Sequence, residues 1–413
     1  MRILWLSNPN WMHTGYGIQT KAITSRLARD GHEIHVLCTA GLSPASGIIR
    51  MGDITFYPPG RDPWGNDMVQ FIYNMIDADC MIGLGDIFCL TPKDMPNDAD
   101  FEAMIGRKGI WCQVVPFDHD PIGAYSEIEA LRACTVPIAM SQHGKALMEK
   151  NGIGCVYIPH GIDTDVAFRP DRDAGVLFRK HHSIPQDAFL ITFVGYNRGT
   201  PPTRKGIEYL LQAVADLNSE GYDDIHVYLH TDPLPIGDML GSLHIPKLAI
   251  ALGVGGDKIT CHLADPRHHI LGYPDTYMRA MYNAGDVFCL PSGGEGFGLP
   301  IVEAQACGSP VIVTHWTSMP ELVGGGWTVP YAALTVAPNL GTKRAIVDLK
   351  ALKEAILLAR AMKLNHPGDW QETKLKARKH AETYNASNIY QNLWRPFIHR
   401  VEEELVSKKG VSV

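Results

Sequence analysis

The chain has 413 residues, of which 45% are hydrophobic, and its formal net charge at pH 7 is −7. This length exceeds one ordinary hydrophobic core and suits two domains of about 200 residues each. A mildly acidic protein has no overall attraction for nucleic-acid phosphates or anionic lipids, so we expect no nucleic-acid partner. The start of the chain, MRILWLSNP, is typical of a buried strand and not of a signal peptide. The nine cysteines include no C-x-x-C pair, so we expect reduced thiols in a cytoplasmic protein.

Short apolar segments alternate with helical segments through the first part of the chain. The expected strands are 2–7, 33–38, 80–85, 110–116, 136–140 and 155–160. Their continuous apolar character is typical of strands that are buried on both faces of a parallel sheet. Residues 15–30 have the apolar spacing of a helix, which Gly31 ends.

A second series of the same kind follows the polar segment DTDVAFRPDRDAG, residues 163–175, where we expect a domain boundary. Its predicted strands are 189–195, 225–231, 258–263, 286–292 and 310–315, and its predicted helices are 206–221 and 275–285. After Val336 the expected helices are 348–364, 369–383 and 386–406, with a kink at Pro396. The sequence therefore predicts an α/β protein with two doubly wound, Rossmann-like domains, residues 1–170 and 171–385, followed by a C-terminal helix over 386–413.

The segment PSGGEGFGLPIVEAQACGSPVIV, residues 291–313, carries a specific chemical signal. Pro300 suits the first turn of a helix, so the glycines before it occupy a strand-to-helix turn. Unpaired amides and the helix dipole favour an anion at such a turn. Glu295 and Glu303 would repel that anion unless they face neutral hydroxyl groups, for which a carboxylate is a good acceptor. The segment therefore indicates a ligand with both phosphate and sugar groups, a nucleotide sugar.

The same segment resembles the E-x7-E motif of retaining glycosyltransferases with the GT-B fold, in particular glycosyltransferase family 4 (glycosyl transferases group 1). Four more segments resemble family motifs in the family's order, and the resemblance covers almost the whole chain: TGYG (14–17), IPHGIDTDVAFRP (158–170), FVGYNRGTPPTRKGIEYLLQA (193–213) and THWTSMPELVGGG (314–326). The resemblance implies two Rossmann-like domains that face a central cleft, with the C-terminal helix packed back on the first domain.

By this resemblance, the two glutamates contact the donor. Glu303 would accept hydrogen bonds from the ribose hydroxyls, and Glu295 would lie beside the transferred sugar. The positions that would hold sugar hydroxyls or phosphate lie between them, at Gly296, Phe297, Gly298 and Leu299. Gly15 and Gly17 would form a loop that approaches the diphosphate. Threonine at position 20 departs from the G-x-G-x-x-G fingerprint, which disfavours an oxidoreductase.

The family's paired cations on the donor diphosphate correspond to Arg198 and Lys205. The sequence departs from the family pattern here, because Tyr196-Asn197-Arg198 stands where G-R is usual, and Arg204 stays a second candidate. Fixed cations aimed at the departing diphosphate stabilise the charge that develops in the transition state, in place of a metal. We therefore expect neither a metal nor another cofactor.

One histidine stands out among the 18 in the chain. His119 lies between two aspartates at the end of a predicted strand, where the family has a histidine that touches the donor sugar and assists the reaction. The histidine pairs at 181–182 and 268–269 lack companion ligands for a metal, so we expect them at the surface.

The sequence thus predicts a retaining, metal-independent glycosyltransferase that moves a sugar from a nucleoside diphosphate to a hydroxyl acceptor. Two alternatives stay open: a catalytically degenerate GT-B module that only binds nucleotide or glycan, and a nucleotide-sugar epimerase, which would change the donor without an acceptor. The acceptor would bind mainly to the first domain, where contact with Trp11 or Trp64 is undecided. The helix at 15–30 has only three basic residues, which gives weak support to contact with a membrane surface.

Overall fold

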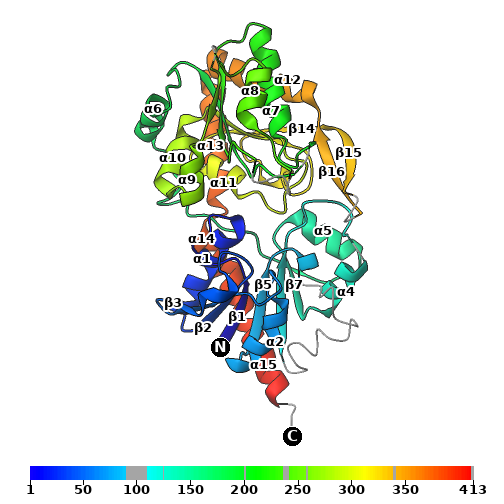
Figure 1. Ribbon diagram of the computed structural model, residues 1–413. Coiled ribbons are helices and arrows are strands. Elements are labelled where there is room, and N and C mark those ends of the chain that lie inside the picture. Colours follow the sequence, from blue (N-terminus) through cyan, green and yellow to red (C-terminus); the bar gives the residue numbers. More distant parts are fainter. Residues whose placement is uncertain are drawn as a thin grey trace. The chain divides into compact units, whose positions relative to one another are not determined.

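The computed structural model describes residues 1–89, 109–123, 125–199, 201–235, 241–256, 259–337 and 341–410. The chain divides into two compact units, which we call unit 1 and unit 2 (Figure 1). Unit 1 is formed mainly by Met1–Gly161 and by the C-terminal segment that begins at Ala386, and unit 2 by the residues between them. The main segment of unit 1 therefore ends at Gly161 and not at residue 170.

Unit 1 is built on a mostly parallel sheet. In the described residues the strand order is β3-β4-β2-β1-β5-β6-β7-β8, and only β3 runs antiparallel to its neighbour. The strands are β1 Arg2–Ser7, β2 Glu33–Cys38, β3 Ile49–Met51, β4 Ile54–Tyr57, β5 Cys80–Leu84, β6 Ile110–Val115, β7 Val136–Ala139 and β8 Val156–Tyr157. The connecting helices are α1 Gly15–Arg29, α2 Asn66–Met75, α4 Tyr125–Ala133 and α5 Gln142–Lys150. The strand order reverses between β1 and β5, so the loops after these two strands leave the sheet side by side.

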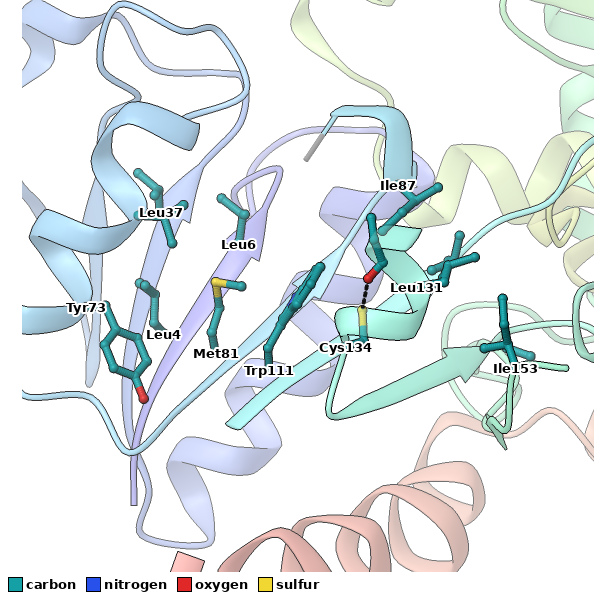
Figure 2. Close-up of a cluster of buried hydrophobic side chains, with 14 of the residues drawn as sticks. Leu4, Leu6, Leu37, Tyr73, Met81, Ile87, Trp111, Leu131, Cys134 and Ile153 are labelled. Carbon is teal, nitrogen blue, oxygen red and sulfur yellow. Dashed lines mark hydrogen bonds between the residues drawn. The ribbon is translucent and has the colours of Figure 1, made fainter. Parts of the chain in front are cut away.

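One face of this sheet carries the core shown in Figure 2. Leu4 and Leu6 of β1 point to the same face as Met81 of β5 and Trp111 of β6, and all four are buried. Helices α2 and α4 cover them and contribute buried side chains such as Leu131. Burial of each large apolar side chain contributes about 1.5–3 kcal/mol, so this face adds substantially to the stability of unit 1.

The C-terminal segment covers the other face of β1. It consists of α14 Ala386–Ile389, a π-helical turn Tyr390–Trp394 and α15 Arg395–Gly410. The Trp5 indole N–H donates to Thr20 of α1, and the Trp5 ring lies 6.0 Å from that of Trp394. In Figure 1 the red α15 accordingly lies with the blue strands from the start of the chain. The predicted return of the C-terminal helix to unit 1 is confirmed, and the helix is irregular one turn before Pro396, which lacks a backbone N–H.

Unit 2 is built on a fully parallel sheet, with helices on both sides (Figure 1). In the described residues the strand order is β11-β10-β9-β12-β13-β14, so it reverses between β9 and β12. The strands are β9 Phe189–Val194, β10 Ile225–His230, β11 Cys261–Leu263, β12 Val287–Leu290, β13 Val311–Thr314 and β14 Gly326–Val329, with a separate pair β15 Tyr331–Ala337 and β16 Thr342–Val347. The helices are α6 Arg172–His181, α7 Ile207–Ser219, α8 Ile245–Ala251, α9 Pro266–Leu271, α10 Asp275–Ala284, α11 Leu299–Ala306, α12 Leu349–Asn365 and α13 Pro367–Glu382.

Most predicted strands and helices are confirmed, with ends that differ by at most four residues. Two differences stand out. The strand β16 lies where the sequence predicts mostly helix, and β11 begins at Cys261, while Lys258, the predicted start, lies outside the described residues. All nine cysteines are free, and all except Cys155 are buried, so the expected reduced thiols are confirmed. No helix in the described part of the chain has the length and apolar character needed to cross a bilayer.

Of the first histidine pair, His181 is exposed as expected, whereas His182 is half-buried. Its Nε2 atom lies 2.8 Å from the Tyr277 hydroxyl, and its ring lies 4.4 Å from Phe178. Burial, with a smaller effect from the neighbouring His181, lowers the pKa of His182 to about 4. Burial also lowers the pKa of His262 in the same unit to about 4. The side chains of the second pair, at 268–269, lie outside the described residues.

These histidines predict that unit 2 loses stability in mild acid. The folded protein keeps His182 neutral down to about pH 4, whereas the unfolded chain protonates it near pH 6.5. Its stabilising contribution is therefore complete above pH 6.5 and is lost as the pH falls toward 4. We expect His182→Phe to lose less stability than the parent between pH 6.5 and 4.5. The free energy of unfolding should fall less steeply in the variant, by less than about 1 kcal/mol per pH unit because the His182 ring is half-buried. Calorimetric melts that fall equally steeply for both proteins would contradict this.

Candidate active site

The loops that follow β9 and β12 are joined to each other at the point where the strand order of unit 2 reverses. The carbonyl of Arg204 accepts hydrogen bonds from the Gly293 amide at 2.6 Å and from the Ser292 hydroxyl at 2.9 Å. Gly206 has φ 65°, and a Cβ there would overlap the carbonyl oxygen of Pro291. Only glycine fits both conditions, so the position immediately after Lys205 fixes how closely the two loops approach.

The two loops bring a lysine and a glutamate into direct contact. Lys205 Nζ lies 2.7 Å from Glu295 Oε1, and Arg204 Nη1 lies 3.6 Å from Glu295 Oε2. Arg204 also donates to the Gly294 carbonyl at 2.9 Å. Burial acts to raise the pKa of Glu295, but the charges of Lys205 and Arg204, with hydrogen bonds from Lys205 and Ser292, outweigh it and lower that pKa. Glu295 is therefore a buried, ionised carboxylate next to two cations.

Hydroxyl groups after β13 hold the backbone around Glu295. The Glu295 amide donates to Thr317 Oγ1 at 3.0 Å, and the Ser318 hydroxyl lies 2.7 Å and 2.6 Å from the carbonyl oxygens of Glu295 and Phe297. Sequence reasoning did not single out these two residues, although both belong to the family-like segment at 314–326. They fix the main chain of the glycine-rich loop independently of the ion pair.

The glycine-rich loop ends at the first turn of α11. Gly298 has φ 110°, and a Cβ there would lie 2.9 Å from Ile301 Cδ1, so a larger residue would disturb the turn. Within the described residues, no group accepts a hydrogen bond from the amides of Gly298 and Leu299, and Pro300 has no amide hydrogen. Open amides at a helix N-terminus form a site for phosphate or for sugar hydroxyls.

Glu303 lies one turn further along α11 and is buried. The hydroxyl of Tyr282, a fully buried residue of α10, donates to Glu303 Oε2 at 2.7 Å. Burial raises the pKa of Glu303 to about 7, and the hydrogen bond from Tyr282 opposes this rise. Because Tyr282 occupies one carboxylate oxygen, it orients the other. The sequence contains no local signal for this contact, since 21 positions separate the two residues.

The structure separates the two candidate arginines. Arg204 is held at the ion pair, and the Thr203 amide and hydroxyl before it both donate to the Glu208 carboxylate of α7. Arg198 is exposed, and in the described part of the chain it forms no hydrogen bond or ion pair. Arg204 is thus the arginine that accompanies Lys205 at Glu295.

In unit 1, His119 is nearly buried at the end of β6. Its Nδ1 lies 2.8 Å from the Pro121 carbonyl, which can only accept, so Nδ1 carries the hydrogen and Nε2 has the lone pair in the neutral ring. His119 Nε2 lies 4.0 Å from Asp118 Oδ1. A side chain at Gly17 would overlap the Met12 carbonyl, so packing alone explains that glycine, while Gly15 is exposed at the start of α1.

The described residues include no group of three or more histidine, cysteine, aspartate or glutamate side chains arranged to hold a metal ion. Metal independence stays a prediction.

Comparisons with known proteins cover most of the chain. Residues 188–357 match the family model described as Glycosyl transferases group 1. The MMP alpha-(1->4)-mannosyltransferase of Mycolicibacterium hassiacum is 35% identical over 364 residues, which cover 78% of this chain and 83% of that protein. The chain belongs to the glycosyl transferases group 1 family.

Two further proteins in these comparisons are similar to this chain. The O-antigen chain mannosyltransferase B of Escherichia coli is 47% identical over 70 residues, 17% of either chain. Among solved structures, sucrose-phosphate synthase from Thermosynechococcus elongatus matches with a TM-score of 0.74 over 98% of this chain and 100% of that one. At 17% identity this match shows the fold alone, which is GT-B. As a group 1 member the chain is a glycosyltransferase with a nucleotide-sugar donor, which favours this class over the epimerase and the degenerate module.

Replacement of Tyr282 by phenylalanine tests how its hydroxyl affects the pKa of the buried Glu303 carboxylate. We expect Tyr282→Phe to raise the pKa of Glu303 further above its usual range, by about one unit, because a hydrogen bond that favours the charged form is removed. Carboxyl carbon shifts in protein labelled at glutamate, followed against pH, measure this. Tyr273→Phe is the matched control, because the Tyr273 hydroxyl donates to the Asp265 carbonyl and not to a carboxylate. An unchanged Glu303 titration in Tyr282→Phe would contradict the assignment.

Proposed function

We propose that the enzyme transfers mannose from a nucleoside diphosphate to a hydroxyl acceptor, with retention of configuration and without a metal. The observation that carries this proposal is the buried Lys205–Glu295 pair, with Arg204 beside it, at the strand reversal of unit 2 and in the loop that leads into α11. Mannose is supported by the two relatives above, both of which are named mannosyltransferases.

Two cations and one carboxylate leave a local formal charge of +1 on the side chains at this pair. A donor diphosphate would bring negative charge to Lys205 and Arg204, and would gain more of it as the bond to the sugar breaks. Fixed cations stabilise that developing charge more than the ground state and so lower the barrier. Glu295 would then exchange its contact with Lys205 for a sugar hydroxyl, which keeps the buried carboxylate hydrogen-bonded.

The remaining groups of the donor would be held by α11 and its neighbours. The open amides of Gly298 and Leu299 suit sugar hydroxyls or phosphate oxygens. Glu303 would accept from the ribose hydroxyls with the oxygen that Tyr282 leaves available, because the Tyr282 hydroxyl fixes the carboxylate plane from the other side.

Retention follows if the acceptor attacks the face from which the diphosphate departs. The departing phosphate oxygen would then take the proton of the acceptor hydroxyl, and no strong protein base is needed. His119 is proposed to contact the donor sugar and not to act as that base. The same cations that hold the diphosphate would replace a metal.

A set of cation variants tests the assignment within unit 2. We expect Lys205→Ala and Arg204→Ala each to lower kcat by roughly 100- to 1,000-fold, because each removes a fixed charge from the leaving group. Arg198→Ala should stay within a few-fold of the parent. Lys353→Ala is the matched control, since Lys353 pairs with Glu220 on the surface of the same unit. Transfer of radiolabelled mannose gives the rates. A large effect of Arg198→Ala with none of Arg204→Ala would reverse the assignment of the second cation.

Metal independence and retention are tested on the intact protein with a panel of nucleoside diphosphate mannoses. We expect transfer to continue in the presence of a chelator, and the product to keep the anomeric configuration of the donor when followed by NMR. A transfer rate that collapses in chelator and returns with Mg²⁺ or Mn²⁺ would contradict metal independence. A product with inverted configuration would contradict retention, and a donor altered without any acceptor would indicate an epimerase.

A further inference from the structure

Thr317 has a backbone conformation that a β-branched residue rarely adopts. Its φ is 51°, in the left-handed region. Among the described residues other than glycine, Asp77 and Ser183 also have a positive φ, of 49° and 54°. Both come directly after the last capping residue of a helix, α2 and α6, where a left-handed residue commonly ends the helix. Thr317 instead follows the strand β13, so helix termination does not explain its conformation.

The left-handed conformation costs free energy in a threonine. The Cβ of an L-residue comes close to the following carbonyl oxygen there, and a β-branched side chain has little freedom to relieve the crowding. Such a residue persists only where the surrounding structure holds it, and residues of this kind gather at active sites. An outlier of this kind in contact with the glycine-rich loop therefore points to a role in the candidate active site.

The neighbours of Thr317 are fixed on both sides by contacts within unit 2. The ring of Trp316 lies 5.1 Å from the ring of Tyr331 in β15, in a T-shaped orientation. Ser318 is fully buried, and its hydroxyl lies 2.6 Å from the carbonyl oxygen of Phe297. Because both neighbours are held by other elements, the main chain between them can keep a strained conformation.

In this conformation the hydroxyl of Thr317 meets the main chain of Glu295. Its Oγ1 accepts from the Glu295 amide at 3.0 Å. The carboxylate of the same glutamate contacts Lys205 Nζ at 2.7 Å. The two contacts come from different loops, one after β13 and one after β9. Glu295 is therefore fixed twice, at its main chain by Thr317 and at its side chain by Lys205.

We propose that Thr317 is a positioning residue for Glu295, and that its strained backbone is kept because it places Oγ1 at the Glu295 amide. The role deepens the proposed function and rests on it in one respect. When a donor sugar takes the place of Lys205 at the carboxylate, the contact with Thr317 still holds the main chain of Glu295. A displacement of about 1 Å at a group that contacts the reacting sugar can lower the rate by about 100-fold.

Three variants at this position separate the strain from the hydroxyl. Thr317→Ser keeps the hydroxyl. Thr317→Ala removes the hydroxyl and keeps most of the strain, while Thr317→Gly removes both. Ser183→Gly is the matched control, because Ser183 has a similar φ in the same unit, is exposed, and donates its amide to the Lys180 carbonyl of α6 and not to the site.

The first measurements need no donor. Burial acts to raise the pKa of Glu295, and the charges of Lys205 and Arg204 outweigh it. A loop released from Thr317 would loosen these contacts, so we expect a higher pKa for Glu295 in Thr317→Gly and Thr317→Ala, and the parent value in Thr317→Ser and Ser183→Gly. Carboxyl carbon shifts in protein labelled at glutamate measure this. Calorimetry should show Thr317→Gly melting about 2 °C above Thr317→Ala, because glycine accepts a positive φ.

Transfer of radiolabelled mannose gives the second measurement. We expect kcat to fall about 10- to 100-fold in Thr317→Gly and Thr317→Ala, with the KM for the donor changed only a few-fold. Thr317→Ser and Ser183→Gly should stay within about threefold of the parent. A purely structural role would make activity follow the melting temperature, so that Thr317→Gly would be faster than Thr317→Ala.

The outcomes are distinct from those that test the proposed function. Thr317→Ser as slow as Thr317→Gly, Thr317→Gly as fast as the parent, or an unchanged Glu295 titration in Thr317→Gly would overturn the positioning role. A lower melting temperature for Thr317→Gly than for Thr317→Ala would overturn the strain. A parent protein that transfers no mannose, with the Glu295 titration still dependent on the Thr317 hydroxyl, would instead count against the proposed function alone.

Discussion

The contact between Lys205 and Glu295 depends on the order of strands in unit 2. The two residues are 90 positions apart in the chain, and they meet because β9 and β12 are neighbours at the point where the strand order reverses. A carboxylate as buried as Glu295 is stable only with a partner, since an uncompensated buried charge costs several kcal/mol. The interaction therefore depends on the fold: the sheet brings the two loops together, and the loops place two cations at one buried carboxylate.

Both sheets in the chain show the same arrangement. In each, the chain builds one side of the sheet first, returns to the centre and builds the other side, which leaves two loops side by side at the reversal. Unit 2 has cations and open amides at that place, and unit 1 has amides, an aromatic ring and a carboxylate. The topology places two loops side by side at each reversal, and the residues of these loops differ in charge between the two units.

The parts of the structure that could be predicted are those set by local features of the sequence. The strands of both sheets follow from continuous apolar runs, and the turn before α11 follows from its glycines and Pro300, because these residues act on their own backbone. Contacts across the fold could not be predicted in this way. Tyr282 reaches Glu303 from another helix, His182 packs against aromatic rings of two other elements, and Thr317 and Ser318 hold a loop from the strand beyond it. The choice between Arg198 and Arg204 likewise depends on a loop path that Thr203 and Glu208 fix.

Two contacts between the loops bear on recombination between related genes. Gly206 lies close to Pro291, and the Gly293 amide donates to the Arg204 carbonyl. The two loops fit each other through main-chain atoms, so each loop requires the backbone path of the other. A recombination event with its crossover between residues 207 and 290 would join loops from different parents, and the fit is kept only where both parents share that path. Crossovers outside the span from Thr203 to Ser318 would transmit both loops and the hydroxyls that support them as one block. Hybrid enzymes that keep both loops intact are therefore best assembled by exchange of this whole span.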